Sequence, residues 1–296
     1  MRVLANGIAI EVEDTGEPHL PAVLLVMGLG MQLIAWPAAF VAALQEAGFR
    51  VIRFDNRDAG LSQSFSHLGV PNLMLASMRH RLGLRVNAPY SLHDMAADTL
   101  GVLDALEVPK AHLVGVSMGG MIAQRVALAA PQRVLSLTSI MSSSGARYLP
   151  GPRPHVLKAL FSRPHGRTED AIVEHTMKLL RVIASPAFPS DDEDAMRDRV
   201  RLATRRAFNP TGTMRQMTAV AADIHRADEL PRIQAPTLVM HGQDDPLVPF
   251  PCGHDTARRI RGAKMVAVPG MGHDLPPGVV DRLLQSLMPH LRQTAA

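Results

Sequence analysis

The chain has 296 residues, of which 47% are hydrophobic and 20% charged, and its formal net charge is +4. This content can bury one large core, with or without an inserted lid, so neither a metal nor a disulfide is needed to stabilise the fold. A single cysteine, Cys252, excludes an intramolecular disulfide and is expected to be passive. The scattered basic residues and 4% aromatic content argue against a nucleic-acid partner.

The N-terminal sequence predicts neither a targeting signal nor a membrane span. Acidic residues at Glu11, Glu13 and Asp14 interrupt the segment before an apolar stretch reaches the length of a signal peptide. No other window approaches the apolar length of a membrane span. We therefore expect a soluble, cytoplasmic protein whose partner is a small molecule, and a homodimer is compatible with the sequence.

The apolar patterns predict strands that alternate with helices. Residues 7–13 alternate apolar and polar side chains like an edge strand, whereas residues 22–27 form an apolar run that is typical of a strand buried on both faces. Further strands are predicted at 50–55, 112–116, 134–140, 237–241 and 264–268. Helices are predicted at 38–47, 91–106, 168–182, 191–206, 250–261 and 277–291. A parallel sheet covered by helices follows from this order.

The first predicted turn of interest, MGLG at residues 27–30, follows the second strand. Two glycines let the backbone approach a ligand closely, so the Leu29 N–H can face an oxyanion. Gly28 and the nearby Trp36 are candidate substrate-binding residues. The alternative is an ordinary turn between a strand and a helix.

Two connections precede the helix at 91–106. The loop DNRDAGLS, residues 55–62, contains Arg57 and Asp58, which could pair, and this favours a structural role. Residues 63–90 form a long, irregular connection that carries Arg79, His80, Arg81 and Arg85. Loops of this length in compact domains are usually functional or mobile.

A strand, a sharp turn and a helix meet in HLVGVSMGGMIAQ, residues 112–124. A serine at the apex adopts strained backbone angles, and the turn has room only if Gly115 and Gly119 flank Ser117 at this spacing. The helix directs its N-terminus at the serine, which leaves the Met118 N–H free to stabilise an oxyanion with Leu29. This pattern predicts a nucleophile elbow; the alternative is a tight turn with an incidental serine.

A hydroxyl is a poor nucleophile until a base takes its proton, and a histidine base needs an acid to fix its tautomer. His273 lies in a glycine-rich loop directly after the last predicted strand. Asp245, in the loop after the preceding strand, is favoured over Asp244 because the proline that follows it imposes extended geometry. We expect Asp244 to cap the next helix or to face solvent, and His254 to be structural. A free surface histidine is the alternative for His273.

Residues 142–227 interrupt the strand pattern with prolines, arginines and amphipathic helical pieces. They predict a helical cap inserted into a core formed by residues 1–141 and 228–296. Residues 145–227 contain 12 Arg and 2 Lys against 6 Asp and 3 Glu, a net charge of +5. This excess is either a solvated surface, with Arg197, Arg201 and Arg205 beside acids, or a rim that attracts anionic esters.

The order Ser117, Asp245 and His273, with a cap inserted before the acid, resembles the α/β-hydrolase superfamily over nearly the whole chain. Five segments are similar to the cap-bearing serine esterases around aclacinomycin methylesterase, namely VMGLGMQLIAWP, VIRFDNRDAGLS, LVGVSMGGMIAQ, HGQDDPLVP and GMGHDLP. The resemblance implies an α/β fold with a mostly parallel sheet. It also implies Ser117 as nucleophile, Asp245 as acid, His273 as base, and Leu29 and Met118 as amide donors.

One departure concerns the turn after the second predicted strand, which contains the Leu29 N–H. Many family members have His-Gly where Met27-Gly28 stands here. The donor is a backbone amide, but the support of its loop must differ. Dehalogenases and epoxide hydrolases of the superfamily use aspartate at the elbow, so Ser117 argues against both. We therefore expect a serine hydrolase that cleaves carboxylic esters without metal or cofactor. A cofactor-free haloperoxidase or perhydrolase, or a non-catalytic ligand receptor, is the alternative.

Overall fold

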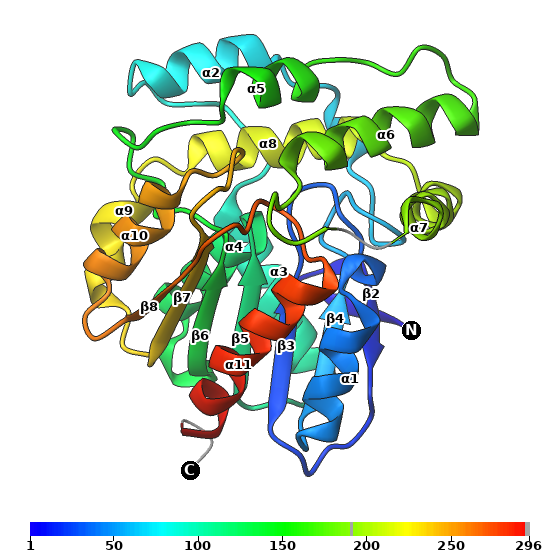
Figure 1. The fold of residues 1–296 in the computed structure, drawn as a ribbon. Coiled ribbons are helices and arrows are strands. Elements are labelled where there is room, and N and C mark those ends of the chain that lie inside the picture. Colours follow the sequence, from blue (N-terminus) through cyan, green and yellow to red (C-terminus); the bar gives the residue numbers. More distant parts are fainter. Residues whose placement is uncertain (190–191, 294–296) are drawn as a thin grey trace.

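The computed structural model describes residues 1–189 and 192–293. Within these residues, a central sheet of eight strands lies between helices on both faces (Figure 1). The strands are β1 (Arg2–Ala5), β2 (Ile8–Asp14), β3 (Ala22–Val26), β4 (Arg50–Phe54), β5 (Ala111–Val116), β6 (Val134–Ile140), β7 (Thr237–Gly242) and β8 (Lys264–Val268). Every predicted strand is present, with ends within one residue of the prediction.

The strand order is β1-β2-β4-β3-β5-β6-β7-β8. β2 pairs antiparallel with β1 and with β4, and all remaining pairs are parallel. Val26, the last residue of β3, lies beside Phe54 of β4 and Gly115 of β5. The loops that follow these parallel strands therefore emerge at one edge of the sheet.

The prediction of an edge strand at residues 7–13 was wrong in its position. These residues form β2, but the unpredicted β1 pairs along its outer side. The connecting residues Asn6 and Gly7 have φ values of 51° and 76°, which suit a tight hairpin turn. The Asn-Gly pair was the available signal, but a partner strand of four residues is too short for a clear apolar pattern.

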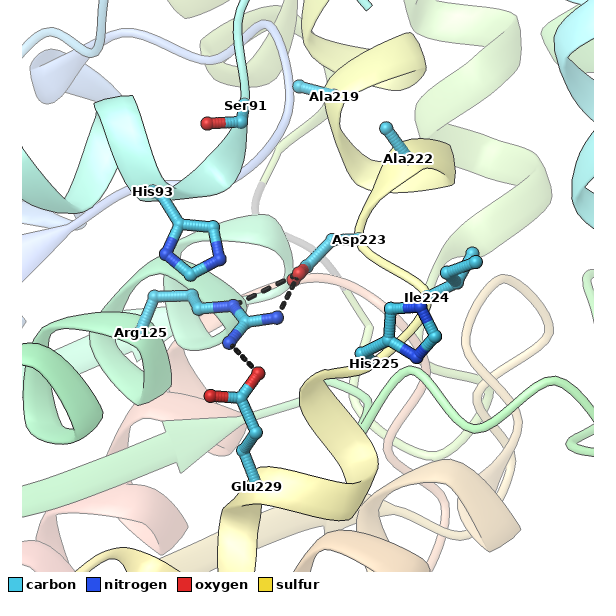
Figure 2. A pocket seen from close by; sticks show the side chains of 9 residues that line it. All are labelled: Ser91, His93, Arg125, Ala219, Ala222, Asp223, Ile224, His225 and Glu229. Carbon is cyan, nitrogen blue, oxygen red and sulfur yellow. Dashed lines mark hydrogen bonds and ion pairs between the residues drawn. The ribbon is translucent and has the colours of Figure 1, made fainter. Parts of the chain in front are cut away.

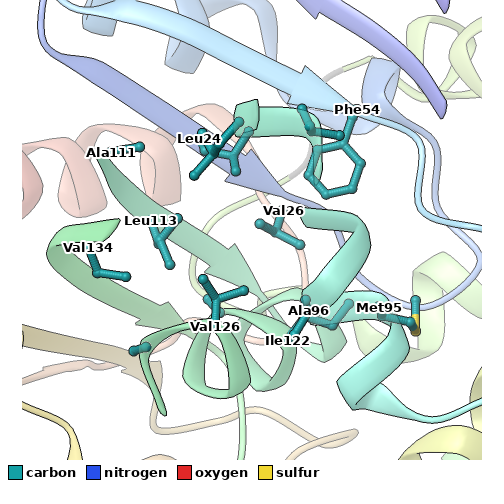
Figure 3. Close-up of a cluster of buried hydrophobic side chains, with 14 of the residues drawn as sticks. Leu24, Val26, Phe54, Met95, Ala96, Ala111, Leu113, Ile122, Val126 and Val134 are labelled. Carbon is teal, nitrogen blue, oxygen red and sulfur yellow. The ribbon is translucent and has the colours of Figure 1, made fainter. Parts of the chain in front are cut away.

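The two sides of β3 contact different helices because successive side chains of a strand point to opposite faces. Leu24 and Val26 pack with residues of α3 and α4, as Figure 3 shows, whereas Val23 and Leu25 pack with α1 and α11. The covering helices are α1 (Ala38–Glu46), α3 (Leu92–Ala105), α4 (Met118–Ala129), α10 (Phe250–Arg259) and α11 (Pro277–Gln293). Burial on both faces explains the continuous apolar run that predicted this strand.

Further helices lie beyond one end of the sheet (Figure 1). They are α2 (Leu73–Arg81), α5 (Pro154–Leu160), α6 (Glu169–Ile183), α7 (Glu193–Arg206) and α8 (Pro210–Ala222). The short α9 (Arg226–Glu229) lies beside α10 instead. Four 3-10 turns complete the described elements, at Leu33–Ala35, Ser66–Leu68, Pro131–Arg133 and Leu230–Arg232. Among the described residues, no helix has both the length and the apolar character needed to cross a bilayer.

Two predictions for this helical region need correction. The segment 63–90 is not irregular throughout, because Asn72 begins α2 by accepting a hydrogen bond from the Leu75 N–H at 3.0 Å, and α2 then packs against α8. Its apolar residues do not follow one face, so no helix was predicted from their spacing. The helix predicted at 191–206 starts at a residue outside the described part, and α7 begins at Glu193.

The loop after β4 has the predicted structural role, but its predicted ion pair was wrong. Arg57 pairs with Asp98 of α3 at 2.6 Å, and Asp58 pairs with Arg215 of α8 at 2.8 Å. Asp58 has φ 65°, so neighbouring side chains leave the chain in different directions. Because these groups are buried, removing one partner would cost about 3–5 kcal/mol, and the two pairs fix the loop between α3 and α8.

Candidate functional site

Ser117 lies at the apex of the turn between β5 and α4, with φ 56° and ψ −121°. A Cβ at Gly115 would lie 2.3 Å from the Gly119 carbonyl oxygen, and a Cβ at Gly119 would lie 2.0 Å from the Val26 oxygen. Only glycine fits at either position. The strained turn is held by the Ser117 N–H, which donates to the Ile140 carbonyl at 2.9 Å.

The structure brings Ser117, His273 and Asp245 together. His273 Nε2 lies 3.0 Å from Ser117 Oγ, and its Nδ1 lies 2.7 Å from Asp245 Oδ2. Asp245 follows β7 and His273 follows β8, and these two strands are neighbours. The arrangement can move a proton from the serine hydroxyl to the imidazole, which the carboxylate then stabilises.

Asp245 is buried and fully hydrogen-bonded. Its Oδ1 accepts from the Leu247 N–H at 2.9 Å and the Val248 N–H at 2.8 Å. Burial alone would raise its pKa, but the charge of His273 and hydrogen bonds from His241 and His273 hold the pKa of this carboxyl well below its usual range. The carboxylate is therefore ionised wherever the protein is folded at ordinary pH.

Asp244 points away from its neighbour, as expected of the second acid. It is exposed to solvent, in agreement with one of the two expected roles, and its Oδ2 accepts from the Gly270 N–H at 2.8 Å. It does not cap α10, whose N-terminal neighbour makes no side-chain cap bond. The contact instead ties the loop after β7 to the loop that carries His273.

The His273 loop is also held by the segment after α6, which the sequence did not indicate. The His273 N–H donates to the Ile183 carbonyl at 2.8 Å, and the Gly272 N–H donates to Ser185 Oγ at 2.8 Å. Ser185 in turn donates to the carboxylate of Asp274, whose pKa is raised chiefly by burial. The chain from residue 183 to 185 thus forms one wall of the loop.

The turn after β3 approaches the serine closely. A Cβ added to Gly28 would lie 3.2 Å from Ser117 Cβ and 3.7 Å from its Oγ. Among the described residues, neither the Leu29 N–H nor the Met118 N–H has a hydrogen-bond acceptor in the protein. Both amides therefore retain their capacity to bind an oxygen of a ligand.

Side chains from two other segments support this turn, where Met27 replaces the histidine common in the family. Asn56 Nδ2 donates to the Met27 carbonyl at 2.9 Å, and the Gly30 N–H donates to Gln216 Oε1 at 2.8 Å. Gln216 of α8 is fully buried, and its Nε2 donates to the Arg57 carbonyl at 2.7 Å. No helix was predicted over the residues of α8, and a glutamine in the segment 142–227 does not by itself reveal its partner.

Trp36 does not line the approach to Ser117. Its side chain is 2% exposed, its ring centroid lies 5.1 Å from that of Phe40, and both belong to the core cluster beneath α1 and α11. The structure thus favours a packing role for Trp36 over the predicted contact with substrate. Gly28 lies beside Ser117, and its contact with substrate stays a prediction.

Two other residues have the predicted structural environments. Cys252 is buried, and burial raises the pKa of its thiol to about 11, in agreement with the expected passive role. His254 lies in α10, where its ring stacks on Phe250 at 6.2 Å between centroids. Neither residue takes part in the hydrogen bonds around Ser117.

A separate cavity of about 210 Å³ lies where the end of α8 meets α3 and α4 (Figure 2). Arg125 lies at its base and donates to Asp223 and, at 2.6 Å, to Glu229. Burial tends to raise the pKa of Asp223, but Arg226 and Arg125 together lower it. The charges in this cavity are thus paired within its lining, which contains none of the three residues around Ser117.

Residues 21–276 match the family described as the alpha/beta hydrolase fold. The chain belongs to this family. Rhodomycin D methylesterase DauP from Streptomyces sp. (strain C5) is 31% identical to this α/β-hydrolase over 98% of this chain and 97% of that protein. A poly(3-hydroxyalkanoate) depolymerase from Ectopseudomonas oleovorans is 30% identical over 84% of this chain and 77% of that protein.

A solved structure of the same fold is a mutant of CumD, the meta-cleavage product hydrolase from Pseudomonas fluorescens IP01, complexed with acetates. It matches this α/β-hydrolase with a TM-score of 0.74, covers 99% of this chain and 97% of its own, and is 22% identical. At this identity the likeness shows the fold alone. The family and fold class predicted from the motifs are confirmed.

Proposed function

We propose that this α/β-hydrolase cleaves carboxylic esters through an acyl-enzyme intermediate, with Ser117 as nucleophile. The observation that carries the proposal is the hydrogen-bond chain from Ser117 Oγ through His273 to buried Asp245. The similarity to a methylesterase over nearly the whole chain supports an ester as substrate and a small alkyl group as its alcohol part.

In the proposed reaction, Ser117 Oγ forms a bond to the acyl carbon while His273 Nε2 takes the hydroxyl proton. Asp245 orients the ring and stabilises the imidazolium, and the Leu29 and Met118 N–H groups bind the oxyanion of the tetrahedral intermediate. Collapse breaks the bond to the alcohol, which leaves with the proton from His273. Water then attacks the acyl-serine in the same way, and the carboxylic acid and free serine are released.

Residues 142–227 serve as the cap of this site in our proposal, inserted into a core of residues 1–141 and 228–296. Two contacts support this role: the Ile183 carbonyl holds the His273 loop and Gln216 holds the turn after β3. The cap therefore contributes to the shape of the site as well as covering it. The arginines of α7 pair with acids of α6 and α7. These pairs favour the explanation that the positive charge of residues 145–227 belongs to a solvated surface.

A fluorophosphonate probe tests the nucleophile directly, because only a serine activated by a base attacks such an electrophile. We expect a mass gain that maps to Ser117 in folded protein, and no gain in the Ser117→Ala variant. Ser142→Ala is the matched control, since Ser142 lies nearby and donates to the Ser117 carbonyl at 2.7 Å. Labelling of another serine, or none, would contradict the assignment.

A further inference from the structure

Exposed apolar side chains gather in two segments, residues 63–90 and 142–168, and we call the exposed residues of these two segments the outer face. Of the 15 large hydrophobic residues exposed in the described part of the chain, nine lie in these segments. They are Leu68, Val70, Met74, Leu75, Met78, Leu82, Leu84, Tyr148 and Phe161. Met74 is 83% and Leu82 64% exposed, so the side chains project into solvent. Such a concentration marks an interaction surface.

The same two segments contain no acidic residue. They carry eight cations, namely Arg79, Arg81, Arg85, Arg147, Arg153, Lys158, Arg163 and Arg167. Within the part of the chain that the structure describes, no carboxylate lies within 4.0 Å of any of these cations, whereas the arginines of α7 pair with acids of α6. The positive charge of the outer face is therefore uncompensated.

The two segments lie on the same side of the molecule. α2 packs on α8, and Figure 1 shows α2 and α5 on the side of α8 that faces away from the sheet. A Cβ on Gly83 would lie 1.7 Å from Arg147 Nη1, which places the end of α2 against the start of the second segment. Ala76 is buried in α2, while Met74 and Met78, one turn apart, are both exposed.

We propose that the outer face binds the surface of an anionic lipid bilayer. Exposed apolar side chains can enter the headgroup region of a bilayer while neighbouring arginines bind its anionic groups, and the outer face supplies both from α2, α5 and the loops beside them. A second copy of this chain would instead bring cations against cations. An uncharged apolar partner would form no favourable contact with the eight cations of the outer face. The proposal does not depend on the role of Ser117.

Co-sedimentation with vesicles tests the proposal. We expect the full-length protein to sediment with vesicles of phosphatidylcholine and phosphatidylglycerol, and much less with phosphatidylcholine alone. Raising the salt from roughly 0.05 to 0.5 M should weaken binding at least about tenfold, because exposed charges are screened. Binding to both vesicle types alike, or to neither, would overturn the proposal.

Paired substitutions separate the outer face from the rest of the surface. Met74→Glu with Met78→Glu, and Arg81→Gln with Arg85→Gln, should each reduce binding at least about tenfold. Leu202→Glu on α7 and Arg261→Gln after α10 are the matched controls, since both residues are exposed outside the outer face. Equal losses in the controls and the test variants would refute the location.

A fluorescent label reports whether the outer face inserts into the bilayer, and it leaves Met74 and Met78 in place. Leu82→Cys and Leu202→Cys can each be labelled with an environment-sensitive fluorophore, because buried Cys252 reacts slowly. We expect a blue shift on anionic vesicles for the label at position 82 and none for the label at position 202. A blue shift at position 82 that instead rises with protein concentration, without lipid, would identify a second copy as the occupant.

Discussion

The buried side chain of Gln216 offers a test of how α8 shapes the surroundings of Ser117. Gln216→Leu keeps a similar volume but removes both hydrogen bonds, which leaves the Gly30 N–H and the Arg57 carbonyl without their partner. An unsatisfied buried group costs about 1–3 kcal/mol, so we expect a loss of about 2–6 kcal/mol in the free energy of unfolding. A domain is typically stable by about 5–15 kcal/mol, so folded protein should remain.

The effect on catalysis follows from the position of Leu29 next to Gly30. Loss of one oxyanion donor lowers kcat by roughly 10²–10³-fold, and a displaced donor retains part of its effect, so we expect a fall in kcat of roughly 10–10³-fold. KM should change little, because the oxyanion exists only in the transition state and the intermediate. Steady-state kinetics on a p-nitrophenyl ester measure both constants, and thermal unfolding measures stability.

Thr218→Val is the matched control for this prediction. Thr218 is also buried in α8, and its hydroxyl donates to the Met214 carbonyl at 2.9 Å, away from the turn after β3. The control should lower Tm without lowering kcat. If Gln216→Leu lowers Tm but its kcat stays within about twofold of the parent, the turn positions Leu29 without Gln216 and the reasoning is refuted.

Ser117→Ala and His273→Ala should each lower ester turnover by roughly 10³-fold or more, and the double variant hardly further, because the residues act as a unit. Asp245→Asn should be severe and Asp244→Asn mild in the same assay, because only Asp245 contacts the ring. His112 is buried, and burial lowers its pKa from 6.5 to about 4, so the folded state binds fewer protons than the unfolded state between these pH values. Stability should therefore fall by up to about 3 kcal/mol as pH drops through that window, and chemical denaturation should show a smaller fall for His112→Gln. If the basic cap selects anionic esters, kcat/KM for a carboxylate-bearing ester should exceed that of a neutral ester of equal size and decline with salt.

Each of these measurements has a contrary outcome. Additive losses in the double variant would mean that the serine and histidine act separately, and a severe Asp244→Asn would move the acid by one position. An unchanged pH dependence in His112→Gln would assign the acid sensitivity to other groups. Equal rates and equal salt response for the two esters would leave the cap charge as a solvated surface.

The capping box of α3 illustrates what local sequence determines. The order Ser91-x-x-Asp94 is the sequence signature of such a box, and in the structure the Ser91 N–H donates to Asp94 Oδ2 at 2.8 Å while the Asp94 N–H donates to Ser91 Oγ at 3.2 Å. Strands buried on both faces, and the strained turn at Ser117, were predicted for the same reason. Each depends on residues a few positions apart, whose steric and hydrogen-bonding preferences act within one element.

The pairing of distant segments depended on tertiary structure. Arg57 and Asp58 are adjacent, yet one pairs with α3 and the other with α8, and no local pattern distinguishes these partners. Gln216 reaches Gly30 across 186 positions of the chain. The sequence alone determined seven of the eight strands of the sheet, the helices that cover it, and the elbow at Ser117. Only the packing of α3 and α8 around the loop after β4 and the turn after β3 decided which buried polar groups meet, because a buried hydrogen bond forms wherever the folded chain brings a donor and an acceptor together.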